Sequence, residues 1–152
     1  MIECVKEEEL EEIHDFINYC IWITYHEYFP EASREDLSYS MDQLLQVYDQ
    51  MQLFMLKNKG RIIGTIALDR TSNTKGQLFL VYVHPDFQRK GIGSTLVSYV
   101  ENIAKEMGLK SIFLFTIEKA KWAIKFYENL GYRITHKKEQ EWGIDVFLEK
   151  EL

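Results

Sequence analysis

The sequence predicts an α/β (α+β) protein in which a mixed, mostly antiparallel central sheet is flanked by helices. Three observations support this fold class. Apolar residues recur at helical spacing in the first fifty residues, strand-like runs separated by short turns fill the middle, and strand and helix patterns alternate after residue 90. The predicted order is β-α-α-β-β-β-α-β-α-β-β. With 152 residues, 46% of them hydrophobic, and no repeat or linker, residues 1–152 are expected to form a single domain.

The N-terminal third is predicted to hold a short strand and two helices. Ile2 to Val5 could form the strand, and helical spacing begins at about Lys6. The apolar positions of this first helix are Leu10, Ile13, Phe16, Ile17, Cys20 and Ile21. An aromatic segment, IWITYHEYFP, follows and ends at Pro30. A second helical region is expected from Ser33, where a serine with Asp36 three residues later resembles an N-terminal capping pair.

In the middle and C-terminal parts of the chain, the spacing of the apolar residues changes from helical to strand-like and then alternates. Residues 52–57, 61–69 and 77–83 are rich in β-branched and aromatic residues, and turn-like sequences separate them, which predicts three consecutive antiparallel strands. A helix is expected over 92–107, with its apolar face at Ile92, Leu96, Val97, Val100, Ile103, Ala104 and Met107 and its end at Gly108. A strand over 111–117, a helix ending at Gly131 and strands over 132–135 and 145–148 complete the prediction.

Composition narrows the function classes. The formal charge of −6 comes from 24 acidic against 18 basic residues, which disfavours a nucleic-acid partner and weakly favours cationic small molecules. The apolar runs are too short to span a bilayer, so no membrane partner is expected, and no metal site is indicated. The acidic N-terminus lacks the pattern of a secretory signal. A cytoplasmic location is therefore predicted, with Cys4 and Cys20 as reduced thiols.

The sequence HPDFQRKGIGS, residues 84–94, is the most informative stretch of the chain. It joins an apolar strand to a helix, and helix N-termini bind anions through unpaired N–H groups. Gly91 and Gly93 lack a Cβ and would let a phosphate approach the backbone, while Arg89 and Lys90 add positive charge. The stretch therefore predicts a phosphate or pyrophosphate site. The alternative is a helix start whose glycines only relieve a tight turn. Neither of the two standard nucleotide-binding glycine patterns is present.

Two motifs resemble the GCN5-related N-acetyltransferase (GNAT) family. The loop of that family follows [QR]-x-x-G-x-[GA], which Gln88, Gly91 and Gly93 match. Its late helix reads A-x-x-F-Y-E-x-x-G-[FY], and the matching residues here are Ala123, Phe126, Tyr127, Glu128, Gly131 and Tyr132. The two motifs occur in the family's order and spacing. The resemblance covers roughly residues 50–150 well and the N-terminal helices only in outline, and it implies the GNAT-like acyl-CoA N-acyltransferase fold.

The resemblance implies roles for individual residues. The main chain of Val81, Tyr82 and Val83 would pair with the pantetheine arm of acetyl-CoA. Its pyrophosphate would be held by a loop made of Gln88, Arg89, Lys90, Gly91, Ile92, Gly93 and Ser94. Arg89 and Lys90 could instead be solvated charges. One position departs from the family, since Ala120 stands where an asparagine commonly contacts CoA; Lys121 or Trp122 could take over that contact.

The catalytic residue implied by the resemblance is Tyr127, which would protonate the departing CoA thiolate. A phenol with an ordinary pKa of about 10 can donate to such a group. The alternative is a tyrosine that only packs at the helix–sheet interface. No general base is assigned, because the strand before the loop carries no carboxylate. Glu118, Glu27 and His26 are the candidates, and the simpler interpretation of each is an ordinary surface or structural residue.

The function that follows from the resemblance is direct transfer of the acetyl group of acetyl-CoA, the cosubstrate, to a primary amine. The acceptor would be a small molecule such as a polyamine, or a peptide or protein amine, and the aromatic segment WITYHEYFP would line its cleft. Neither cysteine has the surroundings of a nucleophile, which disfavours an acyl-cysteine route. A non-catalytic acyl-CoA-binding regulatory module is the alternative function. The choice between a monomer and a homodimer stays open.

Overall fold

A computed structural model describes residues 1–152 and confirms the predicted fold class and the predicted order of strands and helices. The strands are hydrogen-bonded in the order β1-β2-β3-β4-β5-β7-β6, with one parallel pair among antiparallel ones. The chain forms two compact units. The first contains Met1–Asp69 and Phe79–Val100, and the second contains Arg70–Leu78 and Glu101–Leu152. The prediction of a single domain over residues 1–152 stays a prediction.

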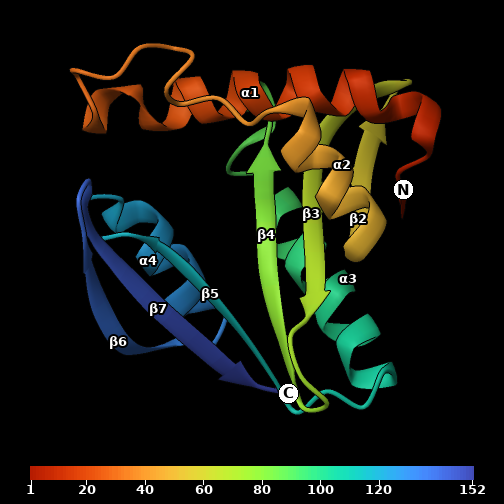
Figure 1. Ribbon diagram of the computed structural model, residues 1–152. Helices are drawn as coiled ribbons and strands as arrows, with labels where there is room; N and C mark the ends of the chain where they lie inside the picture. Colours follow the sequence, from red (N-terminus) through yellow and green to blue (C-terminus); the bar gives the residue numbers. More distant parts are fainter. The chain divides into compact units, whose positions relative to one another are not determined.

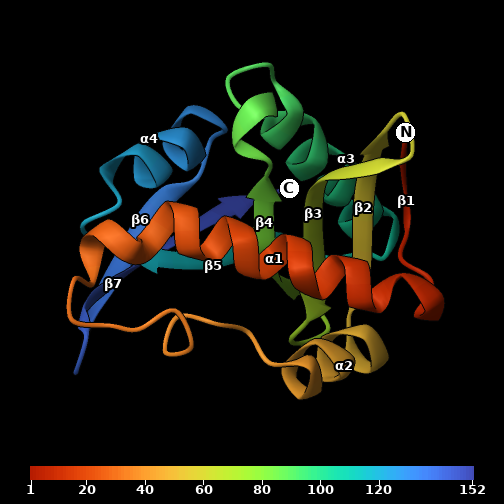
Figure 2. The ribbon, with the colours of Figure 1, turned by 90° about the horizontal axis from the view of Figure 1, so that it is seen from above.

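In the first unit, β1 (Ile2–Cys4), β2 (Gln52–Asn58), β3 (Arg61–Arg70) and the C-terminal half of β4 (Lys75–Val83) lie side by side; Figure 1 shows the last three and Figure 2 shows β1 next to β2. Helices α1 (Leu10–Tyr25) and α2 (Met41–Gln50) cover one face, and α3 (Ile92–Glu106) begins on the other face, as the turned view in Figure 2 shows. The apolar stripe of α1 faces the core, where Ile13 and Ile17 are fully buried. This packing explains why the helical spacing in the sequence is so regular.

Helix α2 begins later than the sequence predicts. Ser33 and Asp36 do exchange the expected pair of hydrogen bonds, at 3.1 and 2.9 Å, but they close a single exposed turn. The helix is capped by Ser40, whose hydroxyl accepts the Gln43 N–H at 3.0 Å while the Gln43 side chain accepts the Ser40 N–H at 2.8 Å. The helix begins at the Ser40–Gln43 pair because buried Leu44 and Val47 follow it, whereas few apolar residues follow Ser33.

In the second unit, the N-terminal end of β4 pairs in parallel with β5 (Ser111–Ile117), and β5 pairs with β7 (Gly143–Glu151). The outer strand is β6 (Arg133–Gln140), and helix α4 (Lys121–Asn129) precedes it. The last two strands are longer than predicted, because the polar sequence between them continues the hairpin ladder down to Gln140 opposite Gly143. Glycine at φ +140° makes that tight reversal possible.

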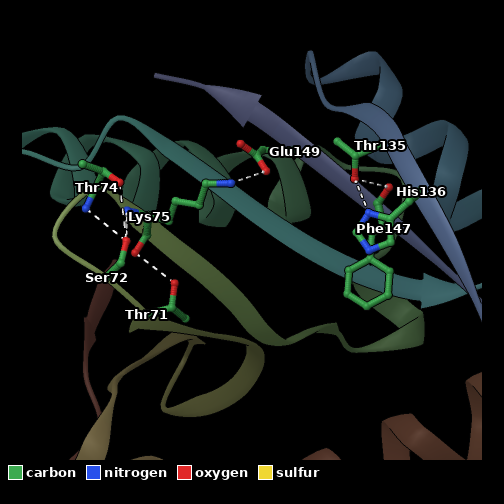
Figure 3. A network of polar contacts seen from close by, with 8 residues as sticks. All are labelled: Thr71, Ser72, Thr74, Lys75, Thr135, His136, Phe147 and Glu149. Carbon is green, nitrogen blue, oxygen red and sulfur yellow. Dashed lines mark hydrogen bonds and ion pairs between the residues drawn. The ribbon is translucent and has the colours of Figure 1, made fainter.

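Polar side chains stabilise the irregular points of this second unit, as Figure 3 shows. The turn before β4 is closed by Ser72, whose hydroxyl accepts the N–H groups of Thr74 and Lys75 at 3.2 and 3.0 Å. Lys75 then reaches Glu149 on β7 with an Nζ–Oε1 distance of 3.2 Å. The register of β6 against β7 shifts at Thr135, whose hydroxyl bonds the Phe147 carbonyl at 3.4 Å.

Candidate active site

Strand β4 leaves regular geometry at Leu80. This residue has φ of +54°, a left-handed conformation that is costly for a leucine, and its carbonyl accepts the hydroxyl of the fully buried Thr65 at 2.8 Å. The pairing of β4 with β5 runs only from Lys75 to Gln77, so the predicted cofactor-binding residues 81–83 lie beyond it. A left-handed residue inside a strand changes the direction of the backbone N–H and C=O groups that follow it. No pattern in the sequence signals this bend, since leucine rarely adopts it.

After β4, the chain turns through His84 and a short 3₁₀ turn, Pro85–Phe87. The imidazole Nδ1 of His84 accepts the Asp86 N–H at 3.1 Å, and its Nε2 lies 2.8 Å from Nη2 of Arg61. The Gln88 side chain then donates from Nε2 to the Val83 carbonyl at 3.0 Å. The glutamine of the loop motif therefore braces the loop against the end of the strand.

The loop itself has the backbone geometry of an anion site. Arg89 (φ +61°) and Gly91 (φ +81°) are left-handed and Lys90 between them is not, an alternation typical of nests of converging N–H groups. A Cβ built on Gly91 would meet no protein atom within 4 Å, so the space in front of it is open. The Gly91 carbonyl accepts the Thr95 N–H at 3.0 Å and the Thr95 hydroxyl at 2.9 Å, which starts α3.

Because α3 begins there, the N–H groups of Ile92, Gly93 and Ser94 fall in the first helical turn, where no intrahelical acceptor is available. Residues 88–91 are exposed and residues 92–94 are half-buried. The Lys90 ammonium lies 5.5 Å above the Phe87 ring, which keeps this cation beside the loop. One strand–loop–helix segment of the first unit thus contains all the residues that the resemblance assigns to the pantetheine arm and the pyrophosphate.

A glycine that the sequence reading did not single out sets the position of α3. A Cβ built on Gly64 of β3 would lie 2.9 Å from Cδ1 of Leu96 and 3.4 Å from the carbonyl oxygen of Tyr82. Leu96 is fully buried on α3. The missing side chain therefore lets the helix pack closely against the strands that precede the loop. The glycine inside an apolar strand, RIIGTIALD, is a signal of close backbone approach that could have identified it.

In the second unit, Tyr127 lies in the last full turn of α4 and is 8% exposed. Its ring meets that of Phe126 with centroids 4.9 Å apart and that of Tyr132 with centroids 5.7 Å apart, both edge to face. The Tyr127 carbonyl accepts the N–H groups of Leu130 and Tyr132, each at 3.0 Å, which ends the helix. The backbone and the ring of Tyr127 are therefore tied to the residues that follow it.

Ala120, the position that departs from the family motif, is fully buried at the N-cap of α4. Its carbonyl accepts the N–H groups of Ala123 and Ile124 at 3.0 and 3.2 Å, and its side chain offers no polar atom. Trp122, one residue into the helix, is 55% exposed. Ala120 itself therefore cannot make the side-chain contact with CoA that the family's asparagine makes.

The three candidate bases have different surroundings. Glu118 pairs with Lys137, with Oε2 2.8 Å from Nζ, and the hydrogen bond to Lys137 lowers the pKa of this carboxyl group. The half-buried His26 has Nδ1 2.7 Å from the Trp22 carbonyl. A carbonyl only accepts, so Nδ1 carries the proton and Nε2 is left as the acceptor of neutral imidazole. Glu27 is exposed.

A shallow cavity of about 410 Å³ lies in the first unit, between α1 and the segment that leads to α2. Its lining residues are His14, Asp15, Asn18, Tyr19, Arg34, Glu35 and Ser38. The Asn18 side chain holds the two walls together, because it accepts the Tyr39 N–H at 2.6 Å and donates to the Tyr39 carbonyl at 3.0 Å. On α1, the Tyr19 ring stacks on His84 with centroids 5.5 Å apart.

The two cysteines are not bonded to each other. Cys20 is buried in the core, and burial raises the pKa of its thiol to about 12, whereas Cys4 is exposed on β1. No group of three or more His, Cys, Asp or Glu side chains is arranged to hold a metal ion. None of the helices is both long enough and apolar enough to cross a membrane.

Among proteins of known sequence, the chain is 31% identical over 123 residues to S-(2-succino)cysteine N-acetyltransferase of Bacillus subtilis, covering 74% of this chain and 73% of that protein. It is 35% identical over 75 residues to probable N-acetyltransferase 14 of Xenopus tropicalis, covering 49% of this chain. The chain spans 36% of the length of that Xenopus relative and 40% of a relative from Methanocaldococcus jannaschii.

Solved structures share the fold. PaiA N-acetyltransferase from Thermoplasma acidophilum, in complex with coenzyme A, superimposes with a TM-score of 0.81 at 22% identity, covering 100% of this chain and 98% of that one. A GNAT family acetyltransferase from Elizabethkingia anophelis with acetyl-CoA bound has a TM-score of 0.76 at 18% identity, covering 100% and 97%. The model of the acetyltransferase (GNAT) family matches residues 17–132, three quarters of the sequence. The chain therefore belongs to the GNAT family of acetyltransferases.

Proposed function

We propose that this protein transfers the acetyl group of acetyl-CoA directly to a primary amine. The observation that carries this proposal is the loop that precedes α3. There, the left-handed Arg89 and Gly91 and the first turn of the helix offer main-chain donors to a pyrophosphate. The open space in front of Gly91 fits a group that must approach the backbone closely.

Residues 81–83 of β4 would bind the pantetheine arm, whose amides can add to an extended strand as a further strand would. The bend at Leu80 supports this role, because it turns the main chain away from regular pairing just before these residues. A main-chain N–H group near this bend would polarise the thioester carbonyl as the amine attacks it.

Tyr127 is the proposed proton donor. As the bond between the amine nitrogen and the acetyl carbon forms, the carbon–sulfur bond breaks and its electron pair leaves on sulfur. The Tyr127 phenol would give its proton to that thiolate. The buried, ring-packed environment of Tyr127 supports a fixed donor rather than a mobile surface side chain.

The proton released by the attacking amine needs an acceptor, and His26 is the best prepared of the three candidates. Its Nδ1–H is committed to the Trp22 carbonyl, so the lone pair of Nε2 is available. Glu118 is a weaker candidate, because its ion pair with Lys137 lowers its pKa and hence its affinity for a proton.

The cavity beside α1 is the proposed acceptor site. Asp15 and Glu35 suit the ammonium form of an amine, and Arg34 suits a carboxylate. A small acceptor that carries both groups, such as an amino-acid derivative, therefore fits alongside the polyamine and peptide amines that the sequence predicts. Relatives named S-(2-succino)cysteine N-acetyltransferase and amino-acid acetyltransferase support the inclusion of amino acids.

The test is a thiol-release assay with acetyl-CoA and separate sets of polyamines, amino acids and peptides. Release above the enzyme-only background, which the exposed Cys4 contributes, is the expected result for at least one set. Calorimetric binding of acetyl-CoA without release on any amine would favour the alternative, a non-catalytic acyl-CoA-binding regulatory module. Ala120, which provides no polar side chain, is the observation that favours that alternative.

A further inference from the structure

A partly buried ion pair lies in the second unit, and no role has been assigned to it so far. Glu101 on α3 is 9% exposed, and both of its carboxylate oxygens lie 3.1 Å from the Lys150 ammonium of β7. The Tyr132 hydroxyl donates to Oε2 of the same carboxylate at 2.9 Å. The Lys150 ammonium also lies 5.7 Å from the centre of the Tyr132 ring. The Glu101 carboxylate and the Lys150 ammonium therefore both contact Tyr132.

Tyr132 is in turn a direct neighbour of Tyr127 through both its backbone and its ring. It is 2% exposed, its N–H donates to the Tyr127 carbonyl, and its ring packs at 74° against the Tyr127 ring. A swing of the Tyr132 side chain about its Cα–Cβ bond would remove that edge-to-face contact. The carboxylate of Glu101 restrains such a swing, because it holds the hydroxyl at the far end of the side chain through a charge-assisted hydrogen bond.

Stability alone does not account for this arrangement. Removing most of the water around the Glu101 carboxylate is costly, and well-packed apolar residues of similar volume are often equally or more stabilising than such a pair. The charges instead fix the position of the Tyr132 hydroxyl, which donates its hydrogen bond to Glu101. Gly131 contributes to the fit, because a Cβ there would lie 3.4 Å from Cε of Lys150.

We propose that Glu101, with Lys150 as its counter-ion, is a positioning residue that acts through Tyr132 on the proton donor Tyr127. This inference rests on the proposed function. Glu101 itself is nearly buried, and it would act by keeping the Tyr132 side chain in the place where its ring supports the Tyr127 phenol.

The same contacts distinguish the two neighbouring tyrosines. Burial, together with the Glu101 charge, raises the pKa of Tyr132 well above its ordinary value. Its proton therefore stays on the hydroxyl and points at Glu101. Tyr132 is thus committed as a structural donor, a role different from the one proposed for Tyr127.

A double-mutant cycle tests the inference. We expect Tyr132→Phe and the charge-free pair Glu101→Gln with Lys150→Met each to lower kcat about tenfold, with KM for acetyl-CoA unchanged. In a Tyr127→Phe background the same changes should not lower kcat further, because the Tyr127 hydroxyl through which they act has been removed. Lys75→Met removes the exposed ion pair with Glu149 in the same unit and serves as the matched control, with kcat unchanged.

A second readout does not need turnover. The ¹⁹F resonance of 3-fluorotyrosine placed at position 127 should be sharp in the parent protein and broadened by Tyr132→Phe or by the charge-free pair, but not by Lys75→Met. Three results would each overturn the inference. The first is an equal loss of kcat with and without the Tyr127 hydroxyl, the second is no loss of kcat at all, and the third is an unchanged resonance. Absence of thiol release by the parent protein would instead reject the proposed function, and the resonance would still decide the positioning role.

Discussion

In the Gln88–Ser94 loop of the first unit, residues 88–91 are exposed and the proposed contacts with the cofactor come from the main chain. Around Tyr127 in the second unit the reverse holds, because the proposed reacting group is one side-chain hydroxyl on a buried ring that packs against Phe126 and Tyr132. A diphosphate is large and highly charged, so several N–H groups can share it. A proton moves between two atoms only, so one side chain must be held in place.

The comparison predicts which kind of substitution harms each region. The loop should be sensitive to backbone conformation and to an added Cβ, and tolerant of changes in side-chain charge. The region around Tyr127 should be sensitive to the loss of single polar atoms while its helix stays folded.

The largest expected effect is that of Tyr127→Phe. Because only the donating oxygen is lost, kcat should fall about 100-fold at neutral pH while the Kd of acetyl-CoA stays unchanged. Stopped-flow or steady-state thiol release and calorimetry measure the two quantities. Unchanged turnover would remove Tyr127 from the proposed mechanism.

Gly91→Ala should have the next largest effect. A Cβ at φ +81° costs about 1–2 kcal/mol of unfolding free energy and fills the space where a phosphate would sit. We expect acetyl-CoA to bind about tenfold more weakly in calorimetry, a loss of the size of one hydrogen bond to a charged group.

Gly60→Ala is the matched control for that prediction. Gly60 lies in the β2–β3 turn with φ of +79°, and a Cβ there also meets nothing within 4 Å. Urea unfolding should show a similar loss of stability for both variants, with weakened acetyl-CoA binding only for Gly91→Ala. Equal binding losses for the two variants would mean that the effect comes from stability.

Arg89→Ala and Lys90→Ala should each have a smaller effect. These exposed side chains add charge beside the loop but are not needed for its conformation, so acetyl-CoA binding should weaken about two- to fivefold. The difference from the parent protein should shrink as salt is raised, because exposed charges are screened. A loss larger than that of Gly91→Ala would show that side chains, not the main chain, dominate this loop.

The smallest expected effect concerns the cysteines. Burial raises the pKa of Cys20 to about 12, so its thiol stays protonated at pH 8, and Cys4 is exposed. Mass spectrometry after iodoacetamide treatment at pH 8 should find one adduct, on Cys4, and a second only after unfolding. Cys4→Ser and Cys20→Ser should both retain thiol release from acetyl-CoA, and loss of turnover in either would reopen a cysteine route.

The sequence by itself determined the order of strands and helices, because that order follows from local hydrophobic periodicity and from the turn sequences and glycines that separate several of the elements. It also located the loop and Tyr127, since both lie within contiguous motifs. Two interpretations of the sequence needed correction. Helix α2 begins after Ser40 rather than Ser33, and the last two strands extend well beyond their apolar residues.

Only the tertiary structure decided the features that depend on residues far apart in the chain. The left-handed Leu80 is held by the hydroxyl of Thr65, and Gly64 is needed because Leu96 packs over it. The Glu101 carboxylate is buried because Lys150 and Tyr132 reach it from other elements. Local sequence preferences describe neighbours along the chain, whereas these arrangements are stabilised by partners across it.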